Sequence, residues 1–184
     1  MRIEELQPGD ETVIQQVAEM LVEGFAEHWP EWVPDTDSAL EEVRESFGVG
    51  RISLVALDED GTPLGWVGGI SRYHGRVWEL HPLVVAVSHQ GEGIGRALVS
   101  SLEQRVRERG GLTITLGTDD VTGQTTLSDV NLLPDVWGHI ARIRNPWRHP
   151  FEFYQKLGYV ITGVVPDANG LGKPDILMAK SLVR

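Results

Sequence analysis

The feature that most constrains this chain is a glycine-rich turn between an apolar segment and an amphipathic one. Residues 77–87 form a long apolar stretch that predicts a strand, whereas residues 94–109 place Leu98, Leu102 and Val106 at helical spacing. The glycines at positions 91, 93 and 95 permit a tight turn and let backbone N–H groups approach a ligand. Because a helix N-terminus carries partial positive charge, this turn predicts a binding site for an anion such as pyrophosphate.

Two familiar nucleotide-binding loops do not fit the turn. A Walker-type loop ends in Gly-Lys-Ser/Thr, but here Gly95 is followed by Arg96 and Ala97. A dinucleotide fingerprint that starts at Gly91 needs glycine at position 96, which is Arg96. One that starts at Gly93 needs glycine or alanine at position 98, which is Leu98. The pattern that remains is Gln90-Gly91-x-Gly93-x-Gly95. A turn that only reverses the chain is the alternative interpretation.

The rest of the chain predicts a single α/β (α+β) domain over residues 1–184. We expect strands at 3–6, 52–57, 64–70, 77–87, 112–116, 159–165 and 176–182. We expect helices at 13–25, at 38–47 behind a Ser38/Glu41 capping box, at 94–109, and from 134 to 157 with a break near Asn145. Hairpins and a strand–helix–strand unit together predict a mixed central sheet of six to seven strands flanked by about four helices.

Charge is unevenly distributed along the chain. The net charge is −11, with 27 acidic and 16 basic residues, which argues against nucleic acid as a partner. Residues 1–60 hold 16 acidic and three basic residues, whereas residues 61–184 hold 11 acidic and 13 basic ones. The acidic part therefore favours a cationic ligand, and the later part can accept an anion. Solvated helix faces are the alternative explanation.

Several classes of chemistry are excluded by composition. The chain has no cysteine, which excludes disulfides, cysteine-ligated zinc and a thiol nucleophile. Its histidines show no metal-ligand spacing, so we expect no metal. No stretch approaches the roughly 20 apolar residues that cross a bilayer, and the start has no signal-peptide pattern. We therefore expect a cytoplasmic protein that does not bind a membrane.

Two segments resemble signatures of the GNAT N-acetyltransferase superfamily. The first is Gln90-Gly91-x-Gly93-x-Gly95, and the second is Phe153-Tyr154-Gln155-Lys156-Leu157-Gly158-Tyr159. Further segments resemble the dimeric aminoglycoside 6′-N-acetyltransferases, a likeness that covers residues 77–184 well: Trp78–Val85, Leu116–Asp120, His149–Tyr154, Lys173–Ile176 and Met178–Lys180. The resemblance implies a homodimer that transfers acetyl from acetyl-CoA to the 6′-amine of an aminoglycoside. It also implies a splayed pair of strands with acetyl-CoA in the opening.

The same resemblance implies how the cofactor is held. Pro82 has no N–H for a sheet ladder, so a break there can leave the N–H of Leu83 free for the thioester carbonyl. The backbone of Val84 and Val85 would pair with the pantetheine arm. The pyrophosphate would be wrapped by the glycine turn, which comprises Gln90, Gly91, Glu92, Gly93, Ile94, Gly95 and Arg96.

Side-chain alternation along a strand predicts that Glu79, His81 and Leu83 point to one face. A protonated amine must lose a proton before it attacks, and Glu79 is the leading candidate for the base, with His81 helping to position it. The alternative is that Glu79 only anchors a cationic substrate.

Three further side chains are candidates for the chemistry or for acceptor binding. Tyr154 fits the family position of the acid that protonates the departing thiolate, although it can instead be a packed aromatic residue. Asp119 and Asp120 follow a strand and are candidates for binding ammonium groups, with a solvated loop as the alternative. Trp29 and Trp32 form either an aromatic lid over the acceptor or a structural clamp.

Two other functions compete with aminoglycoside acetylation. The acceptor can be another polyamine, a small-metabolite amine or a peptide amine. A protein of a different class would sense acetyl-CoA through the same fold without turnover.

Overall fold

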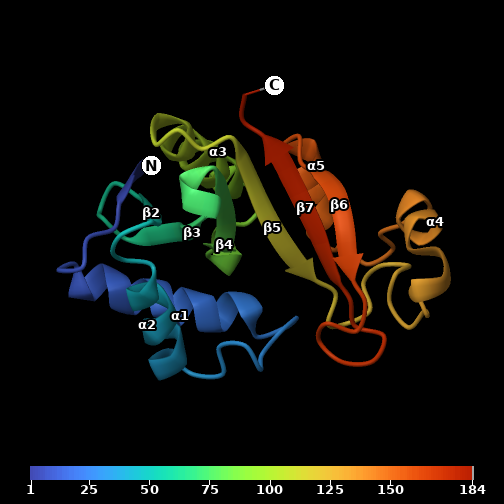
Figure 1. The fold of residues 1–184 in the computed structure, drawn as a ribbon. Helices are drawn as coiled ribbons and strands as arrows, with labels where there is room; N and C mark the ends of the chain where they lie inside the picture. Colours follow the sequence, from blue (N-terminus) through green and yellow to red (C-terminus); the bar gives the residue numbers. More distant parts are fainter. Residues whose placement is uncertain (184) are drawn as a thin grey trace. The chain divides into compact units, whose positions relative to one another are not determined.

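The structure is a computed structural model that describes residues 1–183 (Figure 1). The strands are β1 (Arg2–Glu5), β2 (Arg51–Leu57), β3 (Pro63–Arg72), β4 (Val77–Val85), β5 (Thr113–Asp119), β6 (Val160–Val165) and β7 (Asp175–Ser181). The α-helices are α1 (Glu11–Phe25), α2 (Thr36–Glu45), α3 (Ile94–Glu108), α4 (Val136–Ala141) and α5 (Phe151–Lys156). This order confirms the predicted α/β class with a mixed sheet of seven strands.

The chain divides into two compact units. The first unit comprises residues 1–114 together with the end of the chain from Leu182, and the second comprises residues 115–181. Sheet order is β1-β2-β3-β4 in the first unit and β5-β7-β6 in the second. The predicted splaying of a strand pair and the single-domain boundaries remain predictions.

In the first unit, helices cover both faces of an antiparallel sheet. Side chains of α1 and α2 form one core with alternate residues of the strands, among them Val55, Trp66 and Val84. Helix α3 packs against β2, β3 and β4. Its Leu98 and Leu102 lie where a side chain at Gly65 or Gly69 would project, so α3 occupies the opposite face.

Strand β4 contains one extra residue where it passes Gly68. Val67 is opposite Leu83 and Gly69 is opposite Leu80, so His81 and Pro82 together face Gly68. The His81–Pro82 peptide bond is cis. A Cβ at position 68 would overlap the carbonyl oxygen of His81, which explains why a glycine stands there. The break predicted at Pro82 is therefore a bulge.

The bulge corrects one prediction from side-chain alternation. Glu79 is opposite Ile70, and His81 contacts Trp32 and Glu42 on the face covered by α2. Val84 lies on that same face, because its side chain meets Gly24 of α1. Leu83 is next to Val84 in a regular strand segment and therefore points to the opposite face. The prediction that Leu83 shares a face with Glu79 and His81 is wrong, since the extra residue reverses the alternation.

Several element boundaries also differ from expectation. Helix α2 begins at Thr36 because Asp35 is its N-cap, accepting a hydrogen bond from the Ser38 N–H at 2.9 Å. The predicted capping box at Ser38 is thus one turn too late. Strand β4 ends at Val85, and a short 3₁₀ turn follows at Val87–His89. The segment between α4 and α5 is not helical, which extends the expected break near Asn145.

In the second unit, a buried carboxylate organises the polar segment that follows β5. Asp120 is fully buried. Its oxygens accept hydrogen bonds from the N–H of Gln124 (2.6 Å), the N–H of Thr125 (2.8 Å) and the hydroxyl of Ser128 (2.6 Å). Burial by itself raises the pKa of a carboxylate, but the hydrogen bonds outweigh it, so the pKa of Asp120 lies below its ordinary value.

The Asp120→Asn variant should lower the free energy of unfolding by about 3 kcal/mol at neutral pH. The NH₂ group of an asparagine would face hydrogen-bond donors at a place where the carboxylate accepts hydrogen bonds from them. The pKa of Asp120 is lower in the folded protein than in the unfolded chain. Its contribution to the free energy of unfolding is therefore complete above the unfolded-state pKa and is lost as the pH falls through the folded-state pKa. Urea denaturation should therefore show the gap to the wild type narrowing below about pH 4. Glu152→Gln, which changes an exposed carboxylate in α5, is the control. Equal losses in the free energy of unfolding of the two variants would contradict the structural role of Asp120.

Candidate functional site

The glycine turn leaves a row of backbone N–H groups without partners in the part of the chain that the structure describes. Gly91 and Gly93 have φ values of 85° and 88°, a conformation that glycine adopts readily. Gly93 is the N-cap of α3 and provides no side-chain cap. Within residues 1–183, the N–H groups of residues 91–96 donate to no protein acceptor. Together with the positive end of the α3 dipole, they form a site suited to a polyanion.

Side chains around the turn fix its position and add charge. Ile94 is buried and would contact a side chain at Gly65, which anchors the start of α3 to β3. Nε2 of Gln90 donates to the carbonyl of Val85 at 3.4 Å, tying the turn to the end of β4. Glu92 pairs with Nδ1 of His89 at 3.1 Å, so its carboxylate is held by a neighbouring side chain. Arg96 is exposed and has no ion pair within the described residues, which leaves its guanidinium available to an anion.

The backbone of β4 presents polar groups on the edge away from β3. The Ala86 N–H donates to the carbonyl of Leu64, near the start of β3, at 3.0 Å. Because successive residues of a strand point their N–H groups to alternate edges, Val84 shares that edge and Leu83 and Val85 point to the other. The predicted role of Leu83 and Val85 as backbone donors and acceptors is compatible with this direction, whereas Val84 faces its own sheet partner.

Glu79 lies in an ion pair on the face that α2 covers. Its Oε2 is 2.8 Å from Nε and 2.6 Å from an Nη of Arg72 in β3. Arg72 is two residues beyond Ile70, the residue opposite Glu79, so the pair is a diagonal cross-strand contact. A third of the Glu79 side chain is exposed. The carboxylate is therefore oriented by one oxygen and retains the other for a ligand.

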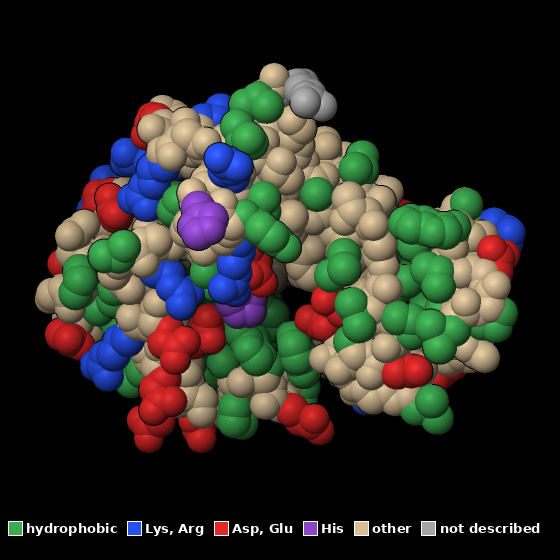
Figure 2. All heavy atoms as spheres, in the orientation of Figure 1, with side chains coloured by type: hydrophobic (Ala, Val, Ile, Leu, Met, Phe, Trp, Pro, Cys, Tyr) green, Lys and Arg blue, Asp and Glu red, His purple; other side chains and the backbone are tan. Residues whose placement is uncertain are grey.

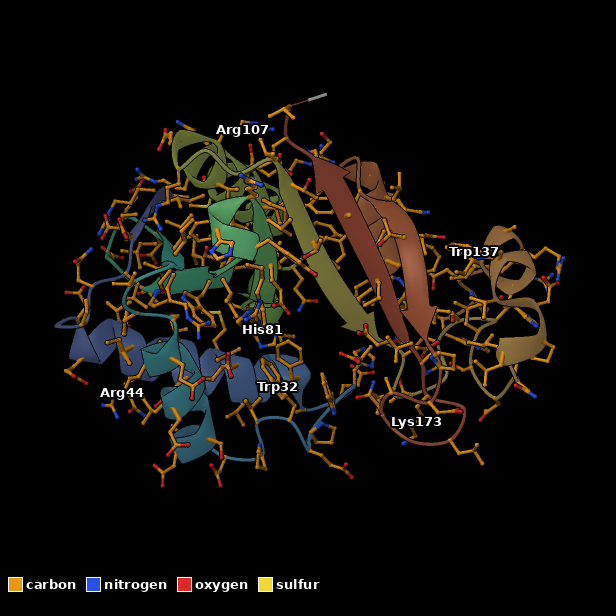
Figure 3. The ribbon with its side chains drawn as sticks, viewed as in Figure 1. Trp32, Arg44, His81, Arg107, Trp137 and Lys173 are labelled. Atoms are coloured by element: carbon orange, nitrogen blue, oxygen red, sulfur yellow. The ribbon has the colours of Figure 1, made fainter. Side chains whose placement is uncertain are left out.

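His81 stands between an aromatic ring and a carboxylate from α2. Its Nε2 is 3.5 Å from Oε1 of Glu42. The edge of the Trp32 ring lies against the imidazole, with 5.5 Å between ring centroids and an interplanar angle of 67° (Figure 3). Trp32 also stacks on Trp29 and meets the edge of Phe25, and it packs against the core formed by α1 and α2. This packing favours the clamp over the lid among the two roles considered for Trp29 and Trp32.

In the second unit, Tyr154 and Asp119 have different surroundings. Tyr154 lies in α5, is buried, and contacts the edge of Tyr159 at a centroid distance of 5.8 Å. Burial raises the pKa of its phenol, which therefore stays protonated at physiological pH. Asp119 ends β5, and its Oδ1 accepts a hydrogen bond from Nδ2 of Asn169 at 2.5 Å.

The three donors on Asp120 make its carboxylate a structural group. Its predicted contact with an acceptor amine has no support in this geometry, because the buried oxygens are already hydrogen-bonded. Asp119 remains the candidate of the two.

Two partners of the site were missed by sequence reasoning. Arg72 is detectable only once the register between β3 and β4 is known, since the pairing of Ile70 with Glu79 places it on the same face. Glu42 has no local signal, because its contact with His81 depends on how α2 packs on the sheet.

Acidic side chains are the main exposed charges over α2, as Figure 2 shows. This helix carries Asp37, Glu41, Glu42 and Glu45 against the single base Arg44. These acids contribute to the excess of negative charge in residues 1–60. Residues 1–183 contain no group of three or more histidine, aspartate or glutamate residues that could hold a metal ion. Among the described helices, none combines the length and apolarity that a bilayer crossing requires.

Comparisons with known proteins agree with this geometry. Residues 14–124 match the acetyltransferase (GNAT) family. A crystal structure of aminoglycoside 6′-N-acetyltransferase complexed with coenzyme A is 41% identical, with a TM-score of 0.91, covering 100% of this chain and 98% of that one. The aminoglycoside 6′-N-acetyltransferase from Enterococcus faecium is also 41% identical, with a TM-score of 0.88 and the same coverage.

A further solved structure, aminoglycoside 6′-acetyltransferase type Ii, is 38% identical, with a TM-score of 0.76, and covers 100% of this chain and 99% of that one. The comparison with curated proteins gave no match. The family match spans more than half of the chain and includes the strand, the glycine turn and the helix that form the anion site. The chain therefore belongs to the GNAT acetyltransferase family.

Proposed function

We propose that this protein is an acetyl-CoA-dependent N-acetyltransferase whose acceptor is the 6′-amine of aminoglycosides. The observation that carries the proposal is the row of unpaired N–H groups at residues 91–96, in a chain 41% identical to an aminoglycoside 6′-N-acetyltransferase solved with coenzyme A. Coenzyme A is a polyanion through its phosphates, and this turn offers the donors and helix dipole that such a ligand needs.

The cofactor would extend from the glycine turn along the edge of β4 that points away from β3. N–H groups of the turn and the Arg96 guanidinium would bind the pyrophosphate, and the backbone of Val85 would pair with the pantetheine arm. The Leu83 N–H, which points to the same edge as Val85, would donate to the thioester carbonyl and stabilise the oxyanion of the tetrahedral intermediate. Because the chain has no cysteine, the amine attacks the thioester directly rather than through an acetylated thiol of the protein.

Glu79 is proposed to bind the ammonium group of the acceptor. Arg72 holds one carboxylate oxygen and fixes its orientation, and the other oxygen is available to a cation. The alternative, that Glu79 removes the proton, predicts a fall in the rate of acetyl transfer on substitution, whereas an anchor predicts mainly a higher KM for the acceptor. Asp119 is a second proposed contact for an ammonium group.

Tyr154 is the proposed acid that protonates the departing thiolate. Its raised pKa keeps the phenol neutral, and therefore able to donate a proton, throughout the physiological pH range. The Tyr154→Phe variant should lower kcat by about 10-fold to 100-fold while coenzyme A affinity, measured by calorimetry, changes by less than about threefold. An unchanged kcat would remove Tyr154 from the chemistry and leave it as a packed aromatic residue.

The acceptor is tested with two aminoglycosides that differ only at the 6′ position, neomycin with an amine and paromomycin with a hydroxyl. We expect acetyl-CoA-dependent release of free thiol with neomycin and none with paromomycin. Equal turnover with both would exclude 6′ specificity and favour another amine. Tight binding of coenzyme A without turnover on any amine would instead support a sensing protein.

A homodimer in the cytoplasm completes the proposal. The resemblance to dimeric 6′-N-acetyltransferases supports it, and so does the apolar surface of the second unit. Large side chains are exposed there, including those of Leu133, Trp137 and Val160. Figure 2 shows hydrophobic side chains gathered over α4, the helix on which Figure 3 labels Trp137. Contact with another copy of the chain would remove this surface from water.

A further inference from the structure

We propose that Glu42 is a positioning residue for acetyl transfer, acting through His81. In this arrangement the Glu42 carboxylate keeps a proton on Nε2 of His81 and presents Nδ1 as the ring nitrogen that takes a proton from the acceptor ammonium. The inference rests on the proposed acetyltransferase function and identifies how the acceptor is deprotonated.

The contacts of the imidazole fix its orientation from two sides. Oε1 of Glu42 is 3.5 Å from Nε2, and the Trp32 ring edge packs against the imidazole. Trp32 is itself held by Phe25 and Trp29, so the ring has a rigid wall on one side. The Glu42 side chain is 23% exposed against 40% for His81, so the imidazole is the more accessible of the two groups.

Glu42 differs from the other acidic residues of α2 because it contacts His81. Glu41 and Glu45 are exposed and have no ion pair among the described residues. Glu42 alone on this helix reaches a histidine of β4, across the face of the sheet that also carries Glu79. A carboxylate beside an imidazole favours the proton on the near nitrogen and stabilises the imidazolium once it forms.

Glu79 and His81 have partners of opposite charge. Oε2 of Glu79 is within 2.8 Å of two nitrogens of Arg72, and this positive partner stabilises the ionised carboxylate. His81 instead faces the Glu42 carboxylate, which can orient the imidazole. In this proposal Glu79 binds the ammonium group, and His81 removes its proton.

The proton transfers balance over one turnover. The ammonium gives one proton to Nδ1 of His81, and the freed lone pair forms the N–C bond with the thioester carbonyl carbon. The C–S bond then breaks with its electron pair on sulfur. The nitrogen loses its second proton while the thiolate gains one, so the products are the N-acetyl amine, coenzyme A and one proton, which passes from His81 to water.

A double-mutant cycle tests this inference with neomycin and acetyl-CoA. The rate constant of acetyl transfer is measured in a single turnover for the wild type, Glu42→Gln, His81→Ala and the double variant. We expect Glu42→Gln to lower the rate by about 10-fold and His81→Ala by about 100-fold. The double variant should match His81→Ala within about twofold, because Glu42 acts only through His81. The KM for neomycin should change by less than about threefold in Glu42→Gln.

Glu41→Gln is the matched control, since it removes the same charge from the next residue of the same helix. It should leave the rate unchanged. Equal rate losses in Glu41→Gln and Glu42→Gln would show that the overall negative charge of α2 affects the rate, and would overturn the proposal. So would a tenfold loss from Glu42→Gln in the His81→Ala background, or no loss in the wild-type background. Absence of turnover by the wild type would contradict the proposed function itself, which distinguishes the two failures.

Discussion

The arrangement of the first unit depends on one extra residue in β4. His81 and Pro82 share the place opposite Gly68, where a side chain would overlap the His81 carbonyl. Before this bulge, Glu79 and His81 point toward α2 and can meet charged and aromatic partners there. Beyond it, the backbone N–H groups of Leu83 and Val85 point to the edge away from β3. A strand without the bulge would not combine these two orientations.

The end of the same strand leads into the start of α3, which has no side-chain N-cap. Gly91 and Gly93 adopt positive φ values, and no side chain of the turn fills the space where a ligand would approach. Six consecutive N–H groups consequently remain available, which is an arrangement that a bound polyanion stabilises. The excess of negative charge in residues 1–60 complements it, since the proposed reaction joins a polycationic acceptor to a polyanionic cofactor.

Local signals predicted the elements and the glycine turn well. Helical and strand periodicity is a property of neighbouring residues, and glycines at 91, 93 and 95 leave few conformations for the chain. The sequence could not show that the bulge reverses the face of Leu83, because that depends on which residue of β3 stands opposite. It also could not show that the buried Asp120 accepts three hydrogen bonds, whereas the Oδ1 of Asp119 accepts one from Asn169. Glu42 and Arg72 were missed for the same reason, since tertiary packing brings them to His81 and Glu79.

The proposed function depends on the N–H groups at the start of α3, which we expect to hold the phosphates of coenzyme A. Calorimetric titration of coenzyme A into Gly93→Ala and Gly110→Ala variants tests it most directly. Both glycines have positive φ values (88° and 78°) and open space where a Cβ would stand, but they lie at opposite ends of α3. We expect Gly93→Ala to weaken coenzyme A binding by about 10-fold or more and Gly110→Ala to leave it unchanged. Equal affinities of the two variants for coenzyme A would contradict it.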